Sequence, residues 1–127
     1  MRCLSILIAA LLVSILAAHA QPERIMEIAR QYGAGSALAA NCPNLTLDQQ
    51  KLEAFFDAEG VYRADLTEGT PFRAQADASA KETLARLSSL AQPGKKNRKQ
   101  VETRACNMLL DVIHANGSLL KGLLAPK

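Results

Sequence analysis

The stretch Val101–Ala115, VETRACNMLLDVIHA, decides the fold because it has the clearest 3.6-residue periodicity in the chain. Its apolar side chains share one broad face: Val101, Ala105, Cys106, Met108, Leu109, Val112 and Ile113. Its polar side chains share the opposite face: Thr103, Arg104, Asn107, Asp111 and His114. A helix of this kind buries its apolar face against other elements. We therefore expect an amphipathic helix that places Cys106 toward a core.

A helix with the same period is expected from about Glu23 to Ala40, where the chain reaches Cys42-Pro43. Gly33 and Gly35 lie inside it, and each glycine weakens a helix by about 1 kcal/mol relative to alanine. A break near Gly33 is therefore one expected outcome.

Two further helices lie between these segments. The first is expected to open at Thr46, with Gln49 completing a capping box, and to stop at Gly60. The second opens at Thr70-Pro71, a capping residue followed by a proline that suits the first turn, and ends before Pro93-Gly94. Its apolar face comprises Phe72, Ala76, Ala80, Thr83, Leu84, Leu87, Leu90 and Ala91.

The chain ends in a leucine-rich tail, 118–127, for which a short helix packed on the core is expected. Polar and apolar residues do not alternate anywhere for long enough to predict a strand. The sequence therefore predicts an all-α fold: a small single-domain bundle of about four helices plus a short C-terminal helix, with one disulfide.

The segment Met1–Ala20, MRCLSILIAALLVSILAAHA, has the layout of a secretory signal peptide. Arg2 precedes an apolar run, and Ala18-His19-Ala20 provides the small-x-small pattern that precedes cleavage. We expect cleavage between Ala20 and Gln21, which leaves residues 21–127 as one helical domain in the periplasm or outside the cell. The alternative is an uncleaved anchor, although the run is short against the roughly 20 apolar residues that a span needs.

Cleavage of this segment would also remove Cys3 and leave Cys42 and Cys106. Two cysteines in an exported chain predict one disulfide. Closing so long a loop stabilises a fold by roughly 4 kcal/mol in the chain-entropy account. The alternatives are a redox or a metal site, but the chain has no C-x-x-C motif and the spacing suits no metal site.

Composition excludes several classes of protein. Among 127 residues, 49% are apolar, which is too many for a disordered chain. The net charge of +3 is too small to indicate a nucleic-acid binder, and it falls to +2 when Arg2 leaves with the signal segment. His114 is the one histidine outside that segment, so no catalytic triad or metal-ligand set can be assembled. We predict no catalytic residue, no metal and no cofactor.

Two groups of side chains are candidates for a partner surface. The first is the basic group Lys95, Lys96, Arg98 and Lys99. The second is the apolar group Leu119, Leu120, Leu123 and Leu124. The alternatives are a solvated loop and helix start for the first group, and packing on the core for the second.

In size, signal layout and two cysteines, the chain resembles small bacterial periplasmic helical proteins with one disulfide, such as acid-stress chaperones. The leading hypothesis is an exported helical protein that acts by protein–protein interaction, without catalysis, as a chaperone, inhibitor or envelope-assembly factor does. Its partner would be a protein rather than a nucleic acid, and it would meet the membrane only during export. The alternative hypothesis is a small-molecule or lipid carrier with an apolar cavity between the helices.

Overall fold

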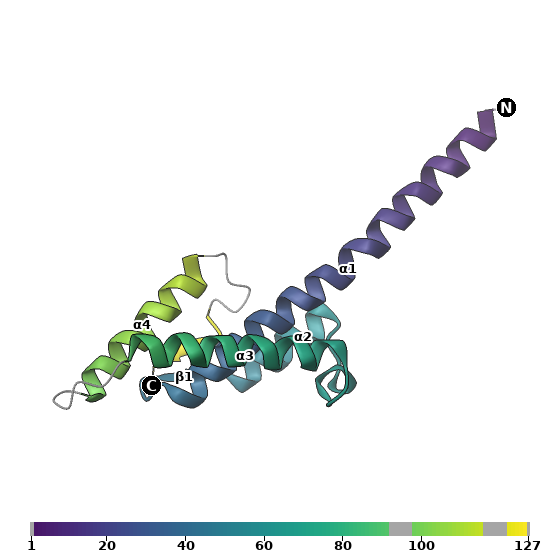
Figure 1. Cartoon of the computed structure of the whole chain (residues 1–127). Helices are drawn as coiled ribbons and strands as arrows, with labels where there is room; N and C mark the ends of the chain where they lie inside the picture. Colours follow the sequence, from purple (N-terminus) through teal and green to yellow (C-terminus); the bar gives the residue numbers. More distant parts are fainter. Residues whose placement is uncertain (1, 92–97, 116–121, 127) are drawn as a thin grey trace.

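The computed structural model describes residues 2–91, 98–115 and 122–126. The described elements are, in order, α1 (Arg2–Asn41), β1 (Leu45–Leu47), α2 (Gln49–Glu59), a 3-10 turn η1 (Arg63–Leu66), α3 (Pro71–Leu90), α4 (Arg98–Ala115) and β2 (Leu124–Pro126). The four helices confirm the predicted small all-α domain. The first half of α1 projects away from the other elements, and α3 runs alongside its second half (Figure 1).

The expected break of the first helix at Gly33 is wrong, because α1 is continuous past this residue. A Cβ atom built on Gly33 would lie 2.0 Å from the carbonyl oxygen of Ala76 in α3. Close by, the Ser79 hydroxyl donates a 2.6 Å hydrogen bond to the carbonyl of Arg30. The glycine therefore lets the backbones of α1 and α3 approach closely, and this packing offsets its low helix propensity.

The start of α2 also differs from the expectation. Thr46 lies in β1, and the helix cap is Asp48, whose carboxylate accepts a 3.1 Å hydrogen bond from the backbone N–H of Lys51. The predicted end is confirmed: Gly60 has φ 74°, and the N–H of Val61 donates to the carbonyl of Phe56 at 2.9 Å. Val61 is buried, in keeping with the apolar contact that often accompanies a Schellman ending.

The start of α3 matches the prediction, since Thr70 accepts a hydrogen bond from the N–H of Arg73 and Pro71 is the first helical residue. Its buried face is narrower than expected. The buried residues of α3 are Phe72, Ala76, Ser79 and Thr83. Leu84 and Leu90, by contrast, keep 37% and 42% of their surface exposed.

One core cluster joins α1, α2 and α3. Its aromatic centre is Phe56, whose ring lies edge-on to Tyr32 at 5.3 Å and to Phe72 at 6.1 Å between centroids. Such edge-to-face pairs contribute about 0.5–1.5 kcal/mol beyond the area that they bury. The buried members are Ile28, Ala29, Leu52, Phe56, Val61, Phe72 and Leu123.

A second core cluster surrounds the disulfide. The predicted Cys42–Cys106 bridge is confirmed and ties the end of α1 to the middle of α4. Its buried members are Leu38, Cys42, Leu45, Cys106 and Leu109. The bridge therefore belongs to the core and fastens α4 to the rest of the domain.

The expected C-terminal helix is wrong for residues 122–126, which form a turn and strand β2. This strand pairs antiparallel with β1, so that Thr46 lies opposite Ala125. Each strand has three residues, too few for alternation to show in the sequence. Over residues 22–91, 99–114 and 122–124, whose side chains the structure describes, no helical stretch has the length and apolar character of a membrane span.

Candidate partner-binding surface

Helix α4 leaves part of its apolar face uncovered. Its inward side chains Ala105, Cys106 and Leu109 are buried, as expected. Met108 and Val112, which were expected on the same buried face, remain 50% and 47% exposed. The structure therefore covers one edge of the apolar face of α4 and leaves the other edge open.

The open edge faces α3 across a groove, which we call the α3–α4 groove. Its lining residues are Arg86, Ser89, Leu90, Met108, Leu109, Asp111 and Val112. The hollow has a volume of about 530 Å³, and its described walls are the two helices. Leu90, Met108 and Val112 are among the most exposed large apolar side chains in the described chain, and all three line this groove.

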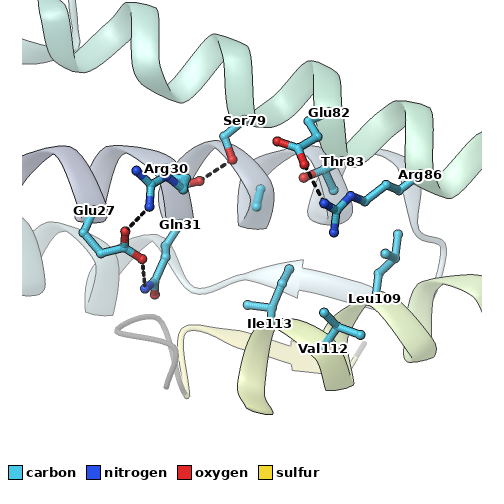
Figure 2. Close-up of a pocket in the computed structure, with 11 residues that line it drawn as sticks. Glu27, Arg30, Gln31, Ser79, Glu82, Thr83, Arg86, Leu109, Val112 and Ile113 are labelled. Carbon is cyan, nitrogen blue, oxygen red and sulfur yellow. Dashed lines mark hydrogen bonds and ion pairs between the residues drawn. The ribbon is translucent and has the colours of Figure 1, made fainter. Parts of the chain in front are cut away.

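A smaller hollow of about 220 Å³ continues the α3–α4 groove toward α1. It shares Arg86, Leu109 and Val112 with the groove, and Ile113 points into it from α4 (Figure 2). Side chains of α1 and α3 form its other walls, including Ala34 and Thr83. The two hollows therefore adjoin each other along α4.

Two ion pairs line the smaller hollow, one on α1 and one on α3. Arg30 pairs with Glu27 on α1, and Arg86 pairs with Glu82 on α3 at 2.6 Å (Figure 2). All four side chains are more than two-fifths exposed, and exposed pairs of this kind contribute about 0–1 kcal/mol.

Of the predicted basic group, Lys99 is the member whose side chain the structure describes, and it does not line the α3–α4 groove. Lys99 is exposed near the start of α4 and lines another hollow, of about 630 Å³, with Arg104 and Met108. Arg98 is the first residue of α4. Lys95 and Lys96 lie outside the described residues.

The structure describes two of the four leucines in the predicted apolar tail group. Leu123 and Leu124 are buried at 7% and 6% exposure, so they belong to the core and not to an exposed surface. The N–H of Asp48 donates to the carbonyl of Leu123 at 2.8 Å, which fixes the tail beside the start of α2. Leu119 and Leu120 lie outside the described residues.

The titratable groups with shifted pKa values lie away from the α3–α4 groove. The Arg24 guanidinium donates a 2.6 Å hydrogen bond to Glu59 and holds the pKa of that carboxyl below its usual range. The pKa of Asp48 is also lowered, chiefly by the hydrogen bond from the backbone of Lys51. Both groups act as structural anchors at the two ends of α2.

His114 is half-buried on α4, and no hydrogen-bond partner is found for its Nε2 atom. Within the described part of the chain, no three His, Cys, Asp or Glu side chains lie close enough together to hold a metal ion. Of the five large apolar side chains that are exposed in the described chain, three (Leu90, Met108 and Val112) line the α3–α4 groove, which makes it the candidate binding surface.

The sequence pattern identified Met108, Val112 and Leu90 as apolar face residues but assigned them to the core. Leu90 lies at the end of α3, beyond Thr83, the last buried residue of that helix.

Comparison with known proteins adds no relative. No protein family, curated protein sequence or solved structure matches this chain at a significant level.

Proposed function

We propose that this chain is a small exported helical protein that acts by binding another protein chain through the α3–α4 groove. In this proposal it performs no catalysis and carries no cofactor. The observation that carries the proposal is the cluster of Leu90, Met108 and Val112, each more than two-fifths exposed, along one groove. Contiguous exposed apolar groups rimmed by polar residues are typical of protein-interaction sites.

The composition of the rim supports a protein partner. Arg86, Ser89 and Asp111 supply both charge signs and a hydroxyl around the apolar side chains. An apolar centre with a polar rim is the usual anatomy of a protein–protein interface. Arginine and methionine, both present here, are enriched at such interfaces.

The shape of the groove favours a protein over a small molecule. Small-molecule sites enclose 70–90% of a drug-sized ligand in roughly 300–1,000 Å³. The hollow with walls from three helices has only about 220 Å³. The larger hollow has walls from two helices, so a small ligand there would keep its outer side in water. A helix of another chain, about 10 Å wide, suits such a trough better.

Export is part of the proposal. Its support is the signal-like segment Met1–Ala20, of which residues 2–20 lie in the projecting first half of α1 (Figure 1). The buried Cys42–Cys106 disulfide adds support because such bonds persist in oxidising compartments. Intact mass of the protein from its own cells tests this step. A chain that begins at Gln21 supports cleavage and export, whereas a chain that retains Met1 contradicts cleavage.

The binding proposal is tested by the size of the protein in gentle extracts of its own cells. We expect a species larger than one chain that is lost in Met108→Asp, because a buried carboxylate would face the apolar partner. Leu84→Asp is the matched control, since Leu84 is also partly exposed on a helix but does not line the α3–α4 groove. A wild-type protein that migrates as a single chain would contradict the proposal, and so would equal loss in both variants.

A further inference from the structure

Helix α4 carries the residue spacing of a coiled-coil seam on its open side. Val101, Ala105, Met108 and Val112 follow one another at steps of four, three and four residues. This alternation is the heptad pattern by which two helices pack side by side. Ala105 is already buried within the chain, whereas Met108 and Val112 are about half exposed and Val101 is half-buried. The seam therefore offers Val101, Met108 and Val112 to another helix.

Two opposite charges flank the seam. Arg104 and Asp111 each directly precede a seam residue, lie seven residues apart and are both exposed. Seven residues make one heptad, which is two helical turns, so both side chains lie on the same side of the seam. Met108 lies between them, close to the midpoint.

Arg104 has no acidic neighbour one turn away on its own helix. The residues three and four positions away are Gln100, Val101, Asn107 and Met108. Pairing within α4 through the usual spacing is therefore not open to it.

These charges are complementary to those of a second, antiparallel copy of α4. With a two-fold axis near Met108, Arg104 of each copy lies at the level of Asp111 of the other, and the two Met108 side chains meet. An interface of this isologous kind repeats every contact, so two such ion pairs form at once. A parallel pair in register would instead place Arg104 of one copy beside Arg104 of the other, and these like charges repel.

The wall formed by α3 fits this arrangement. Leu90 is 42% exposed, and with Ser89 it lines the same groove as Met108 and Val112. A second α4 in the groove would contact both helices, and the symmetry would bring α3 and α4 of each copy into one four-helix interface.

We propose that the α3–α4 groove binds the α4 helix of a second copy of this chain, antiparallel about a two-fold axis near Met108. This inference rests on the proposed function, because it names the chain that the groove binds. In this dimer the open seam, Arg104 and Asp111 all lie in one two-fold symmetric interface.

Sedimentation of the purified full protein, with its disulfide intact, tests the inference. We expect a dimer that dissociates on dilution. Arg104→Asp should weaken it about tenfold, because two exposed ion pairs become repulsive contacts. Asp111→Arg should weaken it similarly. The double variant with both changes should recover most of the affinity, because the charges are then exchanged and still opposite. Circular dichroism of each variant checks that the helices are intact.

A wild-type protein that is a single chain at all concentrations would overturn the inference, and so would a double variant no tighter than Arg104→Asp alone. If the purified protein is a single chain but the protein in cell extracts is part of a larger, Met108-dependent complex, only the second-copy inference fails. If both preparations contain single chains, the proposed function fails as well.

Discussion

The backbone of Gly33 in α1 lies directly against Ala76 in α3, so closely that a Cβ atom at position 33 would be 2.0 Å from the Ala76 carbonyl oxygen. This approach sets the spacing of the two helices. It also positions Ser79 to donate its hydrogen bond to the carbonyl of Arg30. The α3 wall of the groove therefore depends on a residue that the sequence pattern marks only as a weak point.

Gly33→Ala should destabilise the domain. The obstructing atom is backbone, so the helices must shift, and overpacking of this kind costs about 1–3 kcal/mol. The roughly 1 kcal/mol gain in helix propensity offsets only part of this cost. Urea unfolding measures the difference, with the exposed Ser88→Ala in α3 as a control that should change stability little. A Gly33→Ala protein more stable than the wild type would contradict the close packing.

Removal of the disulfide by Cys42→Ala together with Cys106→Ala should lower the unfolding free energy by roughly 3–4 kcal/mol. The bridge joins α1 to α4, so α4 should become the first element cut in limited proteolysis. Thiol titration of the unfolded, unreduced wild type should find neither cysteine free. Two free thiols in that protein would contradict the bridge.

Asp48→Ala should cost about 1 kcal/mol, the usual loss when a helix cap is removed. Thr46→Ala is the matched comparison, because Thr46 is exposed in β1 and should contribute less. Urea unfolding of both variants decides between the two caps. A larger loss of unfolding free energy for Thr46→Ala than for Asp48→Ala would contradict Asp48 as the cap and favour Thr46.

Stability should fall in acid through two carboxyls of α2 and its cap. The pKa values of Glu59 and Asp48 are lowered in the folded state, Glu59 by its hydrogen bond from Arg24 and Asp48 by that from Lys51. Their contribution is therefore complete above the unfolded pKa values, about 4, and is lost as the pH falls through the lower folded values. Thermal unfolding from pH 6 to pH 2 should show a decline below about pH 4 that is smaller in Glu59→Gln. The same decline in wild type and Glu59→Gln would contradict the role of the Arg24–Glu59 pair.

The sequence predicted the helices because their limits depend on local signals, and it predicted the bridge because two cysteines lie outside the signal-like segment. The Thr70-Pro71 start, the Gly60 stop and the apolar period of α4 are all encoded within a few residues. The strand pair was missed because β1 becomes a strand only when β2, at the far end of the chain, lies beside it. Because Thr46 belongs to β1 in this pairing, it does not cap α2, and Asp48 is the cap instead.

The groove could be predicted only in part. The pattern placed Met108 and Val112 on the apolar face of α4, which is where the structure has them. Whether such a face is covered depends on how far α1 and α3 extend beside it, and this is a property of packing. Leu84 and Leu90 show the same limit, because the period placed them on the core face of α3 although the structure leaves both partly exposed.

The most direct test of the central claim uses a photo-crosslinking residue at position 112, with the same residue at position 84 as control, in the cells that make the protein. Val112 lines the α3–α4 groove and Leu84 does not. If the groove binds another protein chain, illumination should give a defined crosslinked species from position 112 and none, or a different one, from position 84. Position 112 without any crosslinked protein, or with the same products as position 84, would contradict the account.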